Sequence, residues 1–401
     1  MPDVPYFITL DEALEIVHKT EIQFETEPCS LDEAHNRILA TPLISKVDDP
    51  PFDNSAMDGF AMKYEDTLNP PTELSIIGTI NAAKQESEKK VTSGQAVKIM
   101  TGAPIPDGCD SILQIELCDV QNNRVILKEP SKKYFIRKKG ENLKKGEIIL
   151  KSGSLMTPSR VGLSATMGYP NIPVLKKAKI AIISTGDELR QPGEELQSGE
   201  IYESNSYGLA GLVRWLGHEP VRMHSVSDTM DDLRNALDDA AKNCDIIITS
   251  GGVSMGEWDL VRRIMEEEGD LHFWRVKIRP GSPPLFGKWK NTPIFGLPGN
   301  PVSSHIVFRM LIAPWLRRIT GADGPCEIQT KARLATEIKS TKDCLTLRRV
   351  AIEKDNDGLI ASSIIHQGSG NLASLALSEG LTLLQPGEMP SIGDIIDVLI
   401  L

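Results

Sequence analysis

The sequence DIIITSGGVSMGEWD, residues 245–259, joins a short apolar run to a glycine-rich loop. An apolar run of this length, bounded by turn residues, predicts a buried strand. Glycines directly after a strand allow backbone N–H groups to approach a ligand closely. Around this stretch, residues 176–321 alternate between strand and helix patterns, which predicts a doubly wound, mostly parallel sheet with helices on both faces. The expected strands span 179–184, 221–226, 245–249, 273–278 and 293–297, and the expected helices lie around 209–216, at 229–242 and from Asn300-Pro301 onward.

The remaining sequence predicts further units, so the chain is expected to be an α/β multidomain protein. Capping-box patterns at Thr9 and Ser30 predict helices near the N-terminus. Short β-rich runs separated by Pro, Gly and Asn are typical of a small β domain, inserted into the helical one. The tail carries a hairpin signal, Asn356-Asp357-Gly358. We expect a helical linker domain (1–45 and 141–175), an inserted β domain (46–140), an α/β domain (176–324) and a C-terminal β domain (325–401).

Composition narrows the class of protein. A formal charge of −11 over 401 residues argues against nucleic-acid binding through a general positive surface. Its apolar runs are far shorter than the roughly 20 residues of a membrane-spanning helix, and the acidic N-terminus does not resemble a signal peptide. Six scattered cysteines without a C-x-x-C pair predict reduced thiols and a cytoplasmic location.

Candidate ligand-binding loops follow the expected strands, because ligands bind beyond the carboxyl ends of the strands in such sheets. The loop from Ser250 to Ser254 offers backbone N–H groups and hydroxyl donors, and Gly299-Asn300 lies at a helix N-terminus, so both are suited to anions. Neither loop matches the P-loop or the G-x-G-x-x-G pattern, which argues against those nucleotide sites.

Three acids, Glu188, Asp228 and Asp259, fall beside these loops. Magnesium often bridges substrate phosphates through only one or two carboxylates, so we predict a magnesium site here. Asp228 could instead be a helix N-cap, Glu188 and Asp259 could be solvated, and Asp58-Gly59 could be a structural turn. The histidines show no metal-ligand spacing, so no zinc site is expected.

The basic stretch from Arg275 to Arg279 also falls at this edge. On a strand, Arg275, Lys277 and Arg279 would share one face and could form a cradle for an oxyanion. A solvated basic face is the alternative.

Six motifs in one fixed order resemble the MoeA-type molybdopterin molybdenumtransferase family, which includes the E domain of gephyrin. They are DNSAMDGFA (53–61), IMTGAPIPDGCD (99–110), STGDEL (184–189), TSGGVSMGEWD (249–259), RPGSPPLFG (279–287) and GLPGNPVS (296–303). The Ser-Gly-Gly core by itself is less specific, since the core domain is similar to that of molybdopterin adenylyltransferases and CinA-like proteins.

The resemblance implies four domains, with a C-terminal β-barrel, in an elongated homodimer. It implies an enzyme that uses Mg²⁺ and molybdate to convert adenylylated molybdopterin into molybdenum cofactor with release of AMP. Molybdopterin adenylyltransferase would be its partner in the pathway.

The resemblance also implies roles for residues that match its motifs. Asp58 and Thr101 would reach a site from the inserted domain, across the dimer. Glu188, Asp228 and Asp259 would serve magnesium and the reacting phosphoanhydride. The residues implied in binding pterin and phosphates are Ser250, Gly251, Gly252, Ser254, Pro298, Gly299, Asn300, Pro301 and Ser303. Those implied in binding molybdate are Arg279, Ser282, Arg348 or Arg349, and Ser369.

The chain departs from the family pattern at three places. It has Arg279-Pro-Gly-Ser282-Pro where the family has K-P-G-K-P, Arg275 where the family has lysine, and Asn142 where the family has aspartate. A hydroxyl at Ser282 offers one neutral donor in place of a charged group, so weaker molybdate binding is expected. The alternatives are a diverged non-catalytic or scaffold paralogue, or an adenylyltransferase or CinA-like pyrophosphatase. The acids argue against a scaffold, and the insert and β tail argue against the other two.

Overall fold

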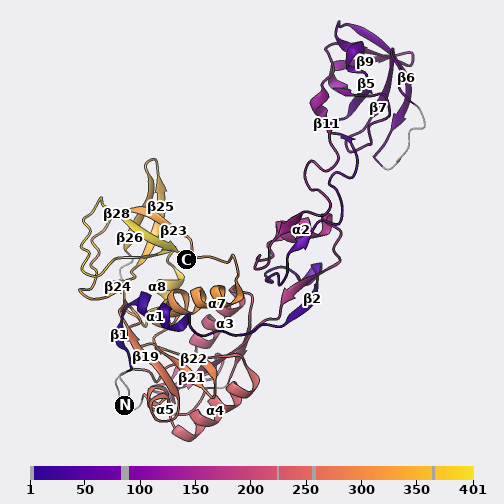
Figure 1. Ribbon diagram of the computed structural model, residues 1–401. Coiled ribbons are helices and arrows are strands. Elements are labelled where there is room, and N and C mark those ends of the chain that lie inside the picture. The colour runs from indigo at the N-terminus through magenta and orange to yellow at the C-terminus, as the bar shows by residue number, and fades with distance from the viewer. Residues whose placement is uncertain (1–3, 83–89, 224, 255–258, 364–365) are drawn as a thin grey trace.

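The computed structural model describes residues 4–82, 90–223, 225–254, 259–363 and 366–401 (Figure 1). The α/β core and the C-terminal barrel lie together, whereas a small linker region and then the inserted sheet extend away from them. This separation determines which of the expected site residues can meet within one chain.

A mixed, mostly parallel sheet of seven strands forms the core. In sheet order the strands are β1 (Tyr6–Ile8), β19 (Asp270–Val276), β21 (Leu285–Trp289), β22 (Thr292–Leu297), β18 (Ile246–Ser250), β14 (Lys179–Ser184) and β17 (Glu219–Arg222). Strands β22, β18, β14 and β17 run parallel to one another, and β21 runs antiparallel to both β19 and β22.

Helices cover both faces of this sheet, as the alternating pattern predicts. On one face, buried residues of α1 (Leu10–Val17), α3 (Asn205–Trp215), α6 (Pro301–Val307) and α7 (Ala313–Thr320) share one apolar cluster with the sheet. On the other face, α4 (Met230–Asn243) and α5 (Leu260–Glu267) form a second cluster. Burial of side chains on both faces explains why β14 and β18 are almost continuously apolar.

The register of the central strands brings three loops to one edge. Ser184 at the end of β14 pairs with Ser250 at the end of β18, and Ser250 pairs with Leu297 at the end of β22. The loops that follow these strands therefore open at the same side of the sheet.

The prediction that residues 1–45 and 141–175 are mainly helical is wrong. Only α1 and α2 (Pro158–Thr166) are α-helices there, and α1 packs on the core sheet. Thr9 and Glu12 form the expected capping box, but Ser30 makes no side-chain cap and only a single 3₁₀ turn follows it. The reason is strand pairing between segments distant in sequence, which local patterns do not reveal. The pairs are β2 (Thr26–Ser30) with β13 (Asn171–Leu175), and β3 (Leu43–Ile44) with β12 (Ile148–Leu150).

The inserted β unit is a sheet of six strands at the far end of the molecule (Figure 1). In sheet order these are β8 (Ser111–Gln114), β5 (Gly59–Met62), β7 (Gln95–Ile99), β6 (Thr72–Ile80), β10 (Arg124–Leu127) and β9 (Cys118–Gln121).

The C-terminal unit is a closed five-stranded barrel, as expected. The predicted hairpin is present, since Asp355 pairs with Gly358. The barrel strands are, in order, β23 (Gln329–Leu334), β26 (Gly358–Ser363), β25 (Arg349–Asp355), β27 (Gly380–Thr382) and β28 (Ile395–Ile400).

A buried histidine lies where the chain leaves and re-enters the core. The Nδ1 atom of His218 accepts a hydrogen bond from the N–H of Ala178 at 3.3 Å, and Phe24 stacks against the ring. Burial, with the charge of Lys177, lowers the pKa of His218 to about 4. Protonation at Nδ1 would break this contact, since the atom could no longer accept.

We predict that acid weakens the fold partly through His218. Because its folded pKa lies below the unfolded value of about 6.5, its contribution is complete above pH 6.5 and is lost as the pH falls toward 4. His218→Gln should flatten the decline of unfolding free energy over this interval by up to about 3 kcal/mol. His305, whose pKa burial also lowers to about 4, and His18, whose pKa burial also lowers, contribute to the remaining slope.

Denaturant unfolding at a series of pH values measures this slope. His35→Gln is the matched control, since His35 is exposed and its replacement should leave the slope unchanged. An identical slope for His218→Gln and the wild type would contradict the assignment.

Candidate active site

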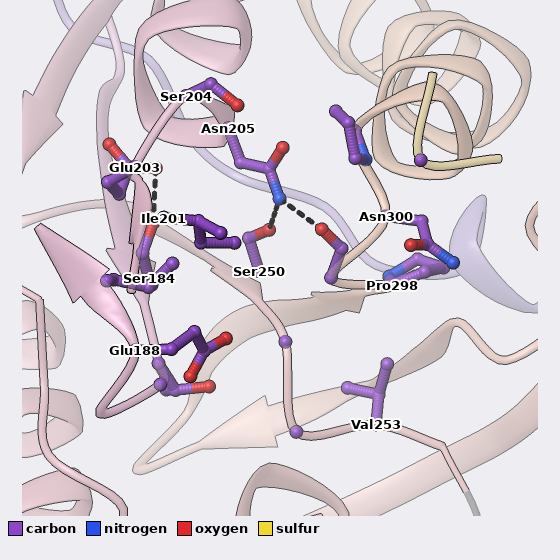
Figure 2. Close-up of a pocket in the computed structure, with 18 of the residues that line it drawn as sticks. Ser184, Glu188, Ile201, Glu203, Ser204, Asn205, Ser250, Val253, Pro298 and Asn300 are labelled. Atoms are coloured by element: carbon purple, nitrogen blue, oxygen red, sulfur yellow. Dashed lines mark hydrogen bonds between the residues drawn. The ribbon is translucent and has the colours of Figure 1, made fainter. Parts of the chain in front are cut away.

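A pocket of about 660 Å³ lies at the edge where β14, β18 and β22 end (Figure 2). The structure brings together here most of the residues proposed for phosphate and metal binding. They are Glu188, Asp228, Ser250, Gly251, Gly252, Ser254, Asp259, Pro298, Gly299, Asn300 and Pro301.

The loop after β18 requires its glycines. Gly251 and Gly252 have backbone φ angles of 105° and 66°, which residues other than glycine rarely adopt. A Cβ atom on Gly251 would also lie 2.8 Å from the hydroxyl of Thr185 in the neighbouring loop. Close packing of the backbones thus places peptide groups at the pocket, as the Ser-Gly-Gly pattern predicts. The motif residues 255–258 lie outside the described part of the chain.

Glu188 and Asp228 come from two loops at one end of the pocket. Burial raises the pKa of Asp228, and the negative charges of Asp187 and Glu188 raise it further. The alternative that Asp228 caps a helix is wrong, because Thr229 is the N-cap of α4 and accepts from the N–H of Asp232. Asp228 thus faces a pocket where like charges gather.

The donor set suits a hard cation that keeps other ligands. Within the described residues, no group of three or more His, Cys, Asp or Glu side chains could hold a metal by itself. Magnesium commonly binds one or two carboxylates and completes its coordination with water and substrate phosphates. A cation held by one or two of these carboxylates, with water and substrate phosphates as its other ligands, therefore fits here better than a closed protein cage.

Two polar residues at the start of α3, Asn205 and the preceding Glu203, connect segments that line the pocket and were not among the expected site residues. The side-chain N–H groups of Asn205 donate to Ser250 Oγ at 2.7 Å and to the Gly299 carbonyl at 2.6 Å (Figure 2). Glu203, only 2% exposed, accepts from the hydroxyl of Ser184 at 3.0 Å. The pattern Glu-Ser-Asn-Ser at the start of an apolar helix is a helix-start signal. Because this signal already explains these residue types, the sequence does not indicate their contacts at the site.

Asp58 and Thr101 do not reach this pocket in their own chain. They belong to the distant inserted unit, where Asp58 Oδ1 accepts from the N–H of Thr101 at 2.6 Å and from its hydroxyl at 2.8 Å. These hydrogen bonds hold the pKa of the Asp58 carboxyl below its ordinary value. Both residues are exposed and close together, so they form a separate charged element.

The basic stretch does not form the single face that alternation predicts. Arg275 has a φ of 69°, which interrupts the extended backbone one residue before β19 ends at Val276. Ile278–Arg279 forms a separate short strand, β20, that pairs with β24 (Leu345–Thr346). Arg279 remains exposed, outside the lining of the pocket.

Ser282 and Ser303 are both buried outside the pocket lining. The hydroxyl of Ser282, 1% exposed, donates to the Ile278 carbonyl at 2.7 Å. Its proton is therefore used within the fold, and the expected weakening of molybdate binding at this position loses its physical basis.

Ser369 and Arg349 lie near the opposite end of the pocket from Glu188. Asn300 donates from its side-chain nitrogen to Ser369 Oγ at 3.0 Å. Arg349 is fully buried, and its guanidinium donates to the carbonyls of His366 and Gly368, both at 3.0 Å. Arg348 instead donates to the Lys339 carbonyl. Of the two arginines, Arg349 is therefore the one that supports the Ser369 loop.

A buried positive charge thus lies behind this loop. Burial lowers the pKa of Arg349, as does the charge of Arg348. In the described part of the chain, Nη1 of Arg349 has no hydrogen-bond partner. An anion nearby would offset this charge.

Among the described residues, no helix is both long and apolar enough to cross a membrane.

Three family descriptions match successive parts of the chain. Residues 8–168 match the MoeA N-terminal region (domain I and II), 181–318 match a probable molybdopterin binding domain, and 331–401 match the MoeA C-terminal region (domain IV). The matched regions include the core and the units on both sides of it, whereas a match to the core alone would have left the related families open.

Curated relatives and solved structures agree with these matches. The chain is 35% identical to a molybdopterin molybdenumtransferase of Nostoc, over 93% of this chain and 88% of the relative. It is 32% identical to the Bacillus subtilis protein of that name, over 95% and 90% of the two chains. A crystal structure of a molybdopterin biosynthesis MoeA protein from Pyrococcus horikoshii is similar with a TM-score of 0.84 at 30% identity, covering 98% of this chain and 100% of that chain. The chain therefore belongs to the MoeA-type molybdopterin molybdenumtransferase family.

Proposed function

We propose that this chain completes molybdenum cofactor by inserting molybdate into adenylylated molybdopterin with release of AMP. The observation that carries the proposal is one pocket with acids at one end, glycine-rich loops in the middle and a loop backed by a buried arginine at the other. The substrate carries a phosphoanhydride, and molybdate is an oxyanion, so the pocket offers a suitable environment for each.

The glycine loops are assigned to the phosphates. Peptide N–H groups and the hydroxyls of Ser250 and Ser254 can stabilise negative charge that develops on the anhydride. Asn300 and Pro301 begin α6, where the helix dipole also favours anions. These N–H groups and the helix dipole are in position before the substrate binds, so little reorganisation is needed.

Glu188, Asp228 and Asp259 are the acids assigned to Mg²⁺, of which one or two would ligate the ion together with substrate phosphates. A bound Mg²⁺ would neutralise the anhydride as a Lewis acid. The raised pKa of Asp228 supports this assignment, because a nearby cation would relieve the repulsion among Asp187, Glu188 and Asp228.

Molybdate is assigned to the end of the pocket near Asn300 and Ser369. The buried charge of Arg349, whose Nη1 atom has no hydrogen-bond partner among the described residues, favours an oxyanion there. Binding molybdate beside the pterin sulfurs would make insertion a proximity effect.

A homodimer would complete the site. Asp58 and Thr101 form a separate exposed pair at the far end of the molecule, and they could serve a pocket only in a second chain. The inserted β domain (46–140) would thus act as an arm that presents Asp58 and Thr101 to the partner. Molybdopterin adenylyltransferase would supply the substrate, in a cytoplasm where the six free cysteines stay reduced.

The first functional prediction concerns the acids. Glu188→Gln and Asp259→Asn should keep the fold but lower AMP release at least a hundredfold, roughly the loss expected when charge stabilisation of a transition state is removed. The measurement is AMP release from adenylylated molybdopterin during a Mg²⁺ titration. Glu195→Gln, on an exposed part of a nearby loop, is the matched control and should behave as wild type. Near-normal turnover of both site variants would refute the metal assignment.

The second functional prediction concerns the shared site. Neither Asp58→Ala nor Asp259→Ala should be active by itself, but subunit exchange between them should restore about a quarter of wild-type activity, because half of the dimers would hold one intact site. The control mixes Asp259→Ala with Glu188→Ala, whose defects lie on the same pocket, so no activity should return. Equal results from the two mixtures would argue against a composite site.

A further inference from the structure

The segment that begins α3 lies at the pocket and makes hydrogen bonds to the ends of β14 and β18 and to the loop after β22. Glu203, just before the helix, bonds to Ser184 at the end of β14. Asn205, its first residue, bonds to Ser250 at the end of β18 and to Gly299 after β22. We propose that Glu203 and Asn205 are positioning residues that hold these loops at a fixed spacing and orient the Ser250 hydroxyl for substrate. This inference rests on the proposed function.

Glu203 is anchored more firmly than a surface carboxylate would be. Its two oxygens accept from the N–H of Ser206 at 2.7 Å and from the Ser206 hydroxyl at 2.6 Å, in addition to Ser184. Arg222 lies 3.8 Å away and also donates to the Ser206 hydroxyl. A buried carboxylate with this many partners fixes the start of α3 against β14.

The Gly299 carbonyl determines which way the Asn205 amide faces. A carbonyl can only accept, so the side-chain nitrogen of Asn205 must be the group directed at it. The same nitrogen then donates its second proton to Ser250 Oγ at 2.7 Å. Asn205 Oδ1 is buried and has no hydrogen-bond partner in the described part of the chain. The orientation that allows both donations therefore leaves the amide oxygen unpaired there.

This arrangement sets the direction of the Ser250 hydroxyl. Because Ser250 Oγ accepts from Asn205, its own proton is free to be donated elsewhere. Within the described residues Ser250 makes no other side-chain hydrogen bond, and it lines the pocket. The free proton would therefore be donated to an oxygen of the bound substrate, a hydrogen bond to a charged group.

The test compares Asn205→Ala and Asn205→Asp with Asn36→Ala. Asn36 bonds the other end of the same helix, donating to the Arg214 carbonyl at 2.9 Å, so it controls for a merely structural loss. We expect Asn205→Ala to reduce kcat/KM for adenylylated molybdopterin about tenfold to a hundredfold, mainly through KM, which is the range for a hydrogen bond to a charged group. Asn205→Asp should lose more, since a carboxylate cannot donate to Gly299, would accept the Ser250 proton and would repel phosphate.

Two further results separate this proposal from its alternatives. If Asn205 acts through Ser250, the double variant Asn205→Ala/Ser250→Ala should lose no more than the more impaired single variant. Independent, multiplying losses would overturn the proposal, and so would equal kcat/KM losses in Asn36→Ala and Asn205→Ala.

Hydrogen exchange of the substrate-free protein tests the positioning role of Asn205 without measuring turnover. Peptides containing residues 250–254 and 299–301 should exchange faster in Asn205→Ala than in Asn36→Ala. Unchanged exchange would refute the positioning role even if activity falls. A wild-type protein that releases no AMP would refute the proposed function, while the exchange result would still decide the role of Asn205.

Discussion

The parallel register of β14, β18 and β22 is the constraint on which the rest of this structure depends. Ser184, Ser250 and Leu297 end at one level of the sheet, so three loops open side by side. Glycines allow these loops to approach each other, since a Cβ atom on Gly251 would lie only 2.8 Å from the hydroxyl oxygen of Thr185. A side chain at Gly251 would crowd Thr185 and push the two loops apart.

The pocket has two ends of opposite electrostatic character. Glu188 and Asn300 lie at its opposite sides (Figure 2). Burial and the negative charges of Asp187 and Glu188 raise the pKa of Asp228, and a cation would relieve this repulsion. The buried charge of Arg349 behind the Ser369 loop favours an anion. The barrel contributes Arg349 and the core contributes the acids, so the polarity of the site depends on how these two units pack.

Much of the core could be predicted from sequence because its signals are local. Apolar runs of strand length, helical spacing and the motif after β18 led to the sheet, its helices and the glycine loops. The linker could not be predicted, since β2 pairs with β13 across more than a hundred residues and the pattern at Ser30 resembles a helix start. The alternation from Arg275 to Arg279 was misleading for another reason: the positive φ of Arg275 interrupts the extended backbone, and β19 ends one residue later.

The site was predicted less completely than the fold. Motifs identified the loops, but Ser282 is buried and bonded to Ile278, and Asp58 lies far from its own pocket. Asn205 and Glu203 were missed because a helix start explains their residue types equally well. Burial and hydrogen-bond direction, which decide such cases, depend on contacts between segments distant in sequence.

The proposed function requires that cleavage of an adenylylated pterin be coupled to molybdate insertion at this pocket. To test this, the wild-type protein is incubated with adenylylated molybdopterin and AMP is followed, with Mg²⁺ and molybdate each present or omitted. We expect AMP release that requires both ions and is accompanied by active molybdenum cofactor. AMP release at the same rate without molybdate, or no release with both ions present, would contradict it.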